Sequence, residues 1–197
     1  MNTRKDSAVD RRAFVANMVA GAPEALFISG LGSPSYDLFA AGDRDKNFYL
    51  WGAMGASTCL GLGLALAQPE HSVVVVTGDG EQLMGIGSLG TVGVKQPANL
   101  TIVALDNGHF GETGMQRSHA SLGTDLVAVA KGFGIEDAFT IEEDAGFSEV
   151  VSRINARNGT AFARIVVKPD EPPRVLPNRD GTLIKNRFRA ALGLIPF

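Results

Sequence analysis

The sequence predicts an α/β fold with one doubly wound, mostly parallel sheet and helices on both of its faces. Two aliphatic runs, residues 73–77 and 100–105, carry this prediction, because short runs without polar alternation are typical of strands covered on both faces. A helical pattern over residues 82–95 lies between them. A strand, a helix and a strand in this order form a crossover unit, in which the two strands are parallel and usually adjacent.

The segments before this unit alternate in the same way. Apolar spacing and turn residues predict helices over residues 11–20, 33–41 and 57–67, and strands over residues 25–28 and 48–51. Ser33 and Pro34 suit the N-cap and the first position of the second helix. The third helix is rich in glycine, which lowers helix propensity, so we expect it to pack tightly against the sheet, with Cys59 filling space inside.

After the unit we expect an irregular, polar stretch at residues 108–123. Regular structure then resumes, with helices predicted over residues 126–133 and 144–157 and strands over residues 138–141 and 160–167. Four of the nine prolines lie within residues 169–177. Residues 168–197 are therefore predicted to form an extended tail that ends in a short helix over residues 183–192.

The composition narrows the function classes. With 45% apolar residues and a net charge of −3, the sequence fits one globular domain over residues 1–197, and nothing predicts a nucleic acid or an anionic membrane as partner. No apolar run approaches the ~20 residues that cross a bilayer, and the N-terminus lacks the apolar segment of a secretion signal. The single cysteine cannot form an internal disulfide, so a cytoplasmic location is expected.

Polar residues follow both strands of the central unit. The tripeptide GDG occupies residues 78–80 and DNG occupies residues 106–108, and parallel strands bring such segments to one edge of the sheet. Asp79 and Asn107 offer the hard oxygen ligands that Mg²⁺ prefers, and the glycines let backbone N–H groups approach a phosphate at the start of a helix. These residues predict a cradle for a magnesium-bound diphosphate. The alternative is a ligand-free domain whose glycines only make tight turns.

This pattern resembles the cofactor motif of thiamine diphosphate enzymes, in which GDG, a helix, an apolar strand and a paired asparagine follow one another. Asn107 lies 28 positions after Asp79 (107 − 79 = 28), one residue more than in the pyruvate decarboxylase and acetolactate synthase type. That spacing, the turn at residues 97–100, the Asp106-Asn107 pair and the TG-x-Q run at residues 113–116 are similar to the sulfopyruvate and phosphonopyruvate decarboxylase group. The resemblance extends over residues 24–192.

The resemblance implies a thiamine diphosphate-dependent decarboxylase of a small anionic 2-oxo acid, with sulfopyruvate as the first candidate. This chain would be the β subunit, which binds the cofactor diphosphate through Mg²⁺. A separate pyrimidine-domain α subunit would complete the site in an α2β2 or larger assembly. Phosphonopyruvate or another 2-oxo acid stays open as the substrate, as does carboligation in place of decarboxylation. A non-catalytic nucleotide- or effector-binding α/β module is the alternative from another class.

The resemblance also implies roles for particular residues. Asp79, Asn107 and the backbone carbonyl of His109 would bind magnesium. Met54 would hold the cofactor in a bent shape while the carbonyl of Gly52 accepts a hydrogen bond from its aminopyrimidine ring; the alternative for Met54 is a methionine that fills the core. The full set expected at the cofactor is Gly32, Ser33, Gly52, Met54, Gly78, Asp79, Gly80, Glu81, Asn107, Gly108, His109 and Phe110.

The polar loop after Asn107 is where substrate contacts are expected. The side chains of His109 and His119 are candidates for catalysis, and Arg117 and His119 for binding an anionic substrate; for each histidine, a solvated side chain without a role is the alternative. Two residues depart from the family pattern. Glu81 replaces a small or hydroxyl residue, so its carboxylate is expected to point away from the diphosphate. Met115 replaces a glycine, which leaves the substrate less certain than the cofactor.

Overall fold

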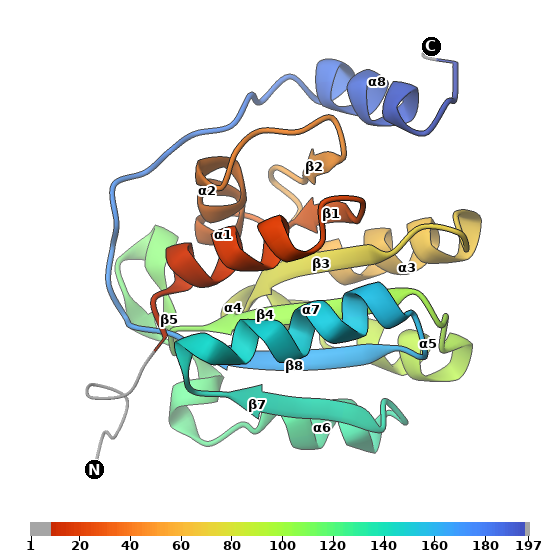
Figure 1. The fold of residues 1–197 in the computed structure, drawn as a ribbon. Helices are drawn as coiled ribbons and strands as arrows, with labels where there is room; N and C mark the ends of the chain where they lie inside the picture. Colours follow the sequence, from red (N-terminus) through yellow and green to blue (C-terminus); the bar gives the residue numbers. More distant parts are fainter. Residues whose placement is uncertain (1–8, 196–197) are drawn as a thin grey trace.

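A computed structural model describes residues 9–195 of the chain. Its centre is a six-stranded sheet in the order β2-β1-β3-β4-β8-β7, in which every neighbouring pair is parallel (Figure 1). The strands are β1 (Leu26–Ser29), β2 (Asn47–Tyr49), β3 (Val73–Gly78), β4 (Leu100–Asp106), β7 (Asp137–Ile141) and β8 (Ala161–Val166). The predicted doubly wound α/β fold is confirmed.

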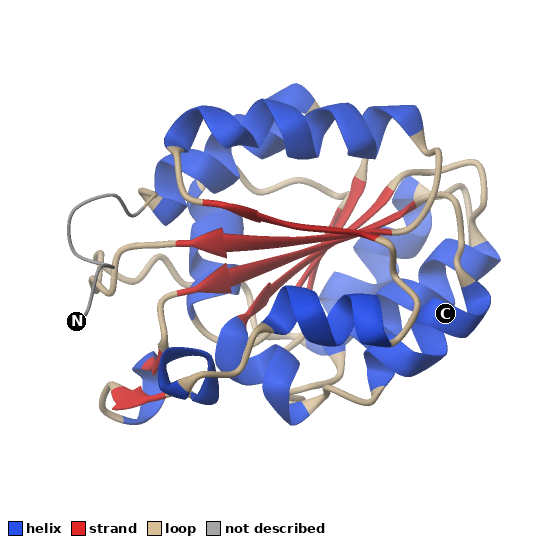
Figure 2. Cartoon of the chain, turned by 90° about the horizontal axis from the view of Figure 1, so that it is seen from below, coloured by secondary structure: helices blue, strands red, loops and turns tan. Residues whose placement is uncertain are grey.

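Helices cover both faces of the sheet (Figure 2). One face carries α1 (Arg11–Gly21), α2 (Ser33–Ala40) and α7 (Phe147–Ala156), and the other carries α3 (Ser57–Ala67), α5 (Ser88–Lys95) and α6 (Leu126–Gly132). Side chains alternate along strand β3, so that Val74 and Val76 enter the first core whereas Val73 and Val75 enter the second. The strand has no solvent-facing side, which is why it consists of consecutive apolar residues.

Helix α3 packs closely on the sheet, as its glycines predict. A Cβ atom at Gly61 would lie 2.1 Å from Cγ2 of Val75, so only glycine allows this approach. The expectation that Cys59 fills space inside this packing is wrong, because Cys59 is exposed. Gly61, Leu62 and Ala65 take the buried positions of the helix, and the spacing of a helical turn leaves position 59 on the outer face.

The central unit differs from its prediction in one respect. The single helix expected over residues 82–95 is wrong, because the chain forms α4 (Asp79–Met84) and α5 with a break at residues 85–87. A Cβ atom at Gly85 would lie 2.0 Å from the carbonyl oxygen of Gly55, so the break lets the end of α4 pack against the turn between β2 and α3. Helix α4 also begins at Asp79, inside the GDG motif rather than after it.

Other boundaries shift by a few residues. Strand β2 ends at Tyr49 rather than at residue 51, since its pairing with β1 ends at Ser29↔Tyr49. Helix α7 begins at Phe147 after a short 3-10 turn. The polar stretch at residues 108–123 contains a small antiparallel hairpin, β5 (His109–Phe110) with β6 (Gln116–Arg117), and two 3-10 turns at Gly111–Thr113 and His119–Leu122.

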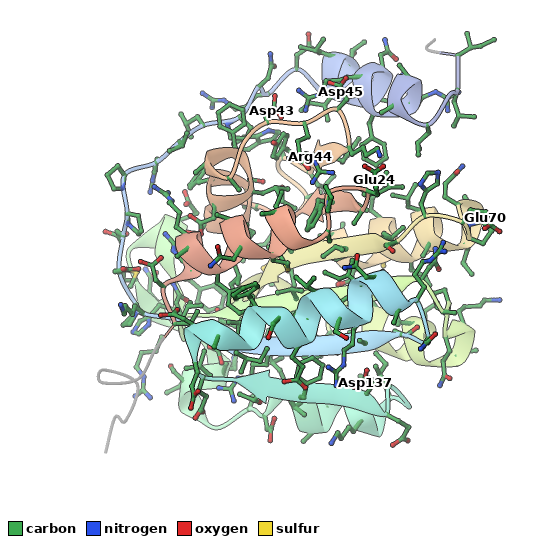
Figure 3. All side chains as sticks on the ribbon, viewed as in Figure 1. Glu24, Asp43, Arg44, Asp45, Glu70 and Asp137 are labelled. Carbon is green, nitrogen blue, oxygen red and sulfur yellow. The ribbon has the colours of Figure 1, made fainter. Side chains whose placement is uncertain are left out.

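The tail after β8 runs extended across the molecule and ends in α8 (Gly181–Ala191), a helix that the sequence placed at residues 183–192 (Figure 1). Arg12 Nη2 donates to the carbonyl of Pro173 at 3.0 Å, which holds the tail to α1. Arg187 of α8 pairs with Asp43 at 2.5 Å and with Asp45 at 3.7 Å, in the loop before β2 (Figure 3). Within residues 9–195 no helix has the length and apolar character to cross a membrane.

Candidate active site

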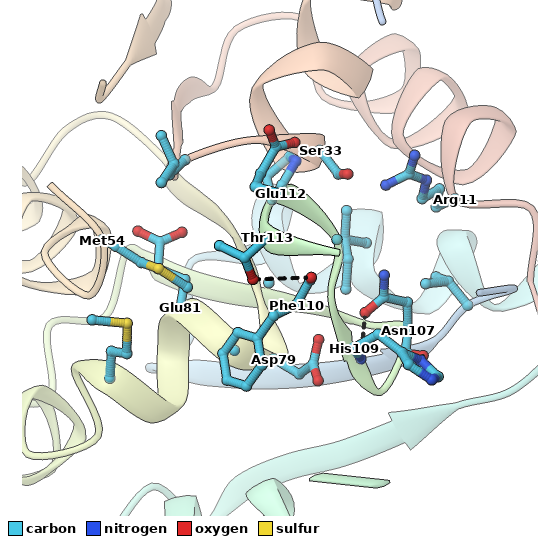
Figure 4. Close-up of a pocket in the computed structure, with 18 residues that line it drawn as sticks. Arg11, Ser33, Met54, Asp79, Glu81, Asn107, His109, Phe110, Glu112 and Thr113 are labelled. Carbon is cyan, nitrogen blue, oxygen red and sulfur yellow. Dashed lines mark hydrogen bonds between the residues drawn. The ribbon is translucent and has the colours of Figure 1, made fainter. Parts of the chain in front are cut away.

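A cavity of about 280 Å³ opens at the carboxyl edge of the sheet, beside the ends of β3 and β4 (Figure 4). The parallel strands bring nine of the predicted residues into its lining: Ser33, Met54, Gly78, Asp79, Gly80, Glu81, Asn107, His109 and Phe110. Gly32, Gly52 and Gly108 lie one or two residues away in the chain from residues that line it. The volume is just below the range of roughly 300–1,000 Å³ typical of complete ligand pockets.

The residues predicted to bind magnesium lie along one wall of this cavity (Figure 4). Asn107 Oδ1 accepts a hydrogen bond from the backbone N–H of His109 at 2.9 Å, and His109 Nδ1 lies 2.8 Å from the carbonyl oxygen of Asn107. In the described part of the chain, no group of three or more His, Cys, Asp or Glu side chains could hold a metal ion. The donors at this wall are instead one carboxylate, one amide and backbone oxygens, a set that suits Mg²⁺ completed by phosphate and water.

Asp79 is a buried carboxylate that takes part in no ion pair within the described chain. The residue is 2% exposed, and no cationic side chain pairs with its carboxylate among residues 9–195. Burial, followed by the negative charge of Asp106, raises the pKa of Asp79 to about 6, while a hydrogen bond donated by Ser118 Oγ acts in the opposite direction. A buried, unpaired carboxylate is costly, so a divalent cation would supply charge that the protein lacks here.

Glycine occurs at different positions around the cavity for different structural reasons. A Cβ atom at Gly80 would lie 2.5 Å from the ring of Phe110, so this glycine allows the hairpin β5–β6 to close over α4. A Cβ atom at Gly78 would meet nothing closer than 4.0 Å, and a Cβ atom at Gly52, where φ is +68°, would meet nothing within 4 Å. Space beside Gly78 and Gly52 is therefore open to a ligand.

Met54 and Glu81 lie on the side of the cavity away from Asn107 (Figure 4). Met54 belongs to neither hydrophobic core, so its place in the cavity wall is not that of a core filler. Thr77 Oγ1 donates to Glu81 Oε2 at 3.0 Å, and a Cβ atom at Gly30 would lie 1.5 Å from that oxygen. The Glu81 carboxylate is thus held against the ends of β1 and β3, where burial raises its pKa and the hydroxyls of Ser57 and Thr77 oppose the shift.

The structure does not bring two of the expected substrate contacts into the cavity. Arg117 is exposed, and its Nε donates to Ser121 Oγ at 3.2 Å, while His119 is exposed at the start of a 3-10 turn. Conversely, Arg11 and Glu112 line the cavity although no motif singled them out. Arg11 comes from the first turn of α1, far from the GDG segment in sequence, so no local pattern could have indicated it.

Residues 42–165 match the family model described as thiamine pyrophosphate enzyme, C-terminal TPP binding domain. The match covers more than half of the chain and includes Met54, the GDG segment and Asn107. The chain belongs to the thiamine pyrophosphate enzymes. It is 43% identical over 143 residues to the sulfopyruvate decarboxylase subunit beta of Methanocaldococcus jannaschii, a match that covers 73% of this chain and 74% of that protein.

Two further proteins resemble the chain, one in sequence and one in fold. It is 37% identical over 186 residues to the phosphonopyruvate decarboxylase of Streptomyces viridochromogenes, covering 91% of this chain but 45% of that protein. The solved thiamine diphosphate-dependent 4-hydroxybenzoylformate decarboxylase of Rhodococcus jostii RHA1 superposes with a TM-score of 0.73 at 21% identity, over 84% of this chain and 34% of that one. The chain therefore spans less than half of these two proteins, and the structural likeness shows a shared fold. The predicted family and fold are confirmed.

Proposed function

We propose that this chain is the diphosphate-binding β subunit of a thiamine diphosphate-dependent decarboxylase that acts on sulfopyruvate. The observation that carries the proposal is the buried Asp79, which has no counter-ion in the described chain and lies beside Asn107 in an open cavity. The name of the Methanocaldococcus jannaschii relative, a sulfopyruvate decarboxylase subunit beta, supports the reaction and the substrate.

The proposal assigns different tasks to the two sides of the cavity. Asp79, Asn107 and the backbone oxygen of His109 would hold Mg²⁺, and the open space beside Gly78 would admit the diphosphate. On the other side, Met54 would support the bent cofactor and the carbonyl of Gly52 would orient its ring. When bound, thiamine diphosphate supplies a nucleophilic carbon and an electron sink through which a 2-oxo acid loses carbon dioxide.

A second polypeptide completes the site in this proposal. The relative named subunit beta implies a counterpart, and the phosphonopyruvate decarboxylase relative has more than half of its length outside the match. We expect a pyrimidine-binding α subunit to supply the carboxylate that activates the cofactor, in an α2β2 or larger assembly. This chain alone would then hold half of an active site.

The positions of the basic side chains in the cavity indicate where the anionic group of the substrate would be recognised. Among the described residues that line it, the basic side chains are Arg11 and His109, and both lie near Asn107 rather than near Met54 (Figure 4). We therefore expect the sulfonate group to be recognised mainly by the α subunit. Phosphonopyruvate is the second candidate substrate, supported by the relative of that name.

The test compares the full chain alone with the chain plus a candidate α subunit. Thiamine diphosphate with Mg²⁺ should raise the melting temperature of the chain alone, because a ligand specific for the native state stabilises it. Carbon dioxide release from sulfopyruvate should require both polypeptides. Full activity of this chain by itself would refute the split site, and the absence of any thermal shift would favour a non-catalytic module. Faster turnover of phosphonopyruvate or pyruvate would overturn the substrate assignment.

A further inference from the structure

A buried cation lies at the end of the cavity that holds Asn107. Arg11 is the first residue of α1, its side chain is 6% exposed, and its guanidinium group points into the cavity between Ser33 and Asn107 (Figure 4). Helix α1 begins at this edge because Val9 pairs with Val167, directly after β8. The fold thus brings the start of α1 beside the end of β4, which pairs with β8.

The protein compensates the charge of Arg11 only in part. Arg11 Nε lies 3.4 Å from Oδ2 of Asp37 and 3.9 Å from Oδ1 of Asp170, yet the guanidinium donates no hydrogen bond within residues 9–195. In the fully buried Asp37, Oδ1 accepts a hydrogen bond from Arg12 Nε at 3.1 Å, whereas Oδ2, which faces Arg11, accepts none among the described residues; Asp170 is half exposed. Two guanidinium groups therefore share one buried carboxylate.

The position of Arg11 is unfavourable for the stability of the ligand-free chain. A cation in the first turn of a helix opposes the helix dipole, and a buried guanidinium without hydrogen bonds is costly. The helix start does not need this side chain, because Asp10 caps it by accepting hydrogen bonds from the N–H groups of Arg12 and Ala13. An anion in the cavity would relieve both costs.

We infer that Arg11 binds the terminal phosphate of the cofactor and that Asp37 positions it; the inference rests on the proposed function. Asp79 and a diphosphate together carry more negative charge than one Mg²⁺ neutralises, so a further cation at this end of the cavity is favourable. Arginine suits this task because its planar fork can face Asp37 through Nε and a phosphate through its two terminal nitrogens.

The test measures the affinity of the full chain for two ligands by calorimetry, thiamine diphosphate and thiamine monophosphate, each with Mg²⁺. Arg11→Gln should weaken thiamine diphosphate binding about 10- to 100-fold, as expected for loss of charge-assisted hydrogen bonds. Binding of the monophosphate should change by less than about threefold, because it lacks the terminal phosphate. Arg11→Lys should fall between the wild type and Arg11→Gln for the diphosphate.

Arg12→Gln is the matched control, since Arg12 lies in the same helical turn and pairs with the same Asp37 but does not line the cavity. It should leave both affinities within about threefold of the wild type. Unchanged diphosphate affinity in Arg11→Gln, or equal losses for both ligands, would overturn the role of Arg11. If Arg11→Gln does not fold, Arg11→Lys decides by the same comparison. If the wild-type chain binds neither ligand, the proposed function fails instead.

Discussion

The ends of β3 and β4 carry two buried carboxylates with opposite surroundings. Asp79 and Asp106 lie side by side at one edge of the sheet and are 2% and 0% exposed. Asp106 accepts hydrogen bonds from Arg164 Nε at 2.6 Å and from the backbone N–H of Gly108 at 2.9 Å. Asp79 receives a hydroxyl and backbone donors but, within residues 9–195, no cation.

The difference in ion pairing between Asp79 and Asp106 shows that burial alone does not identify a functional carboxylate. Arg164 neutralises Asp106, so that residue can hold the DNG segment in place without a ligand. Asp79 keeps an uncompensated charge in a cavity, and the nearby Asp106 raises its pKa further. The unpaired carboxylate at the end of β3 thus lowers the stability of the ligand-free chain, and a bound cation would restore that stability. The paired carboxylate at the end of β4 has no such cost.

The largest effect is expected from Asp79→Asn, which removes the unpaired charge and keeps the shape of the side chain. Affinity for thiamine diphosphate with Mg²⁺ should fall at least about 100-fold, or about 2.7 kcal/mol, as measured by calorimetry. Unchanged affinity in this variant would contradict the proposed difference between Asp79 and Asp106, because it would show that Asp79 does not bind the metal.

The same variant should make the ligand-free chain more stable. The pKa of Asp79, raised from 3.8 to about 6, means that the folded state holds this proton more tightly than the unfolded state. The wild type therefore loses stability as the pH rises from about 4 to about 6, by up to about 3 kcal/mol, and Asp79→Asn does not. Thermal unfolding without ligands at about pH 4.5 and about pH 7.5 measures this, and an equal melting temperature for both proteins at the higher pH would contradict it.

The substitution Asp106→Asn should reduce stability rather than binding. It leaves Arg164, whose side chain is 17% exposed, without its carboxylate, so the free energy of unfolding should fall by about 1–3 kcal/mol in chemical denaturation. Cofactor affinity should stay within about fivefold. Arg164→Met and the double variant complete a cycle that isolates the pair. A loss of binding as large as that of Asp79→Asn would show that both carboxylates serve the metal.

Met54→Ala sharpens the comparison because it leaves both carboxylates untouched. Cofactor affinity should stay within about fivefold, while turnover of the assembled enzyme should fall at least about tenfold, or about 1.4 kcal/mol of barrier. The chain should keep its stability within about 1 kcal/mol, since Met54 lies outside both cores. If turnover stays within about twofold, Met54 does not shape the cofactor.

The smallest effect is expected from Glu81→Gln, at another buried carboxylate of this edge. The side chain is held by Thr77 and lies against Gly30, so cofactor affinity should change by less than about threefold. The ligand-free chain should gain less than about 1 kcal/mol, because the hydroxyls around Glu81 already offset part of the cost of its burial. A calorimetric loss close to that of Asp79→Asn would add Glu81 to the ligand-binding residues.

The sequence by itself determined the fold class, the edge of the sheet at which the cavity opens and half of the residues that line this cavity. Four consecutive valines indicate a strand covered on both faces, and parallel strands must end together, so Asp79 and Asn107 had to meet. Met54 was predicted to lie at the same site from the resemblance of its turn to the family pattern, and not from hydrophobic periodicity. These predictions succeed because burial and backbone geometry restrict which residue types can follow one another in the sequence.

Only the tertiary structure decided which groups face one another. Arg164, 58 residues after Asp106, makes that carboxylate structural, and the close contact of Gly85 with the carbonyl oxygen of Gly55 lies at the break after α4. The start of α1 brings Arg11 to the cavity, while Arg117 turns away toward Ser121. Local sequence patterns predict that a residue is buried, but the charged side chains that contact it come from segments distant in sequence. The difference in charge pairing between Asp79 and Asp106 therefore arises only in the folded chain.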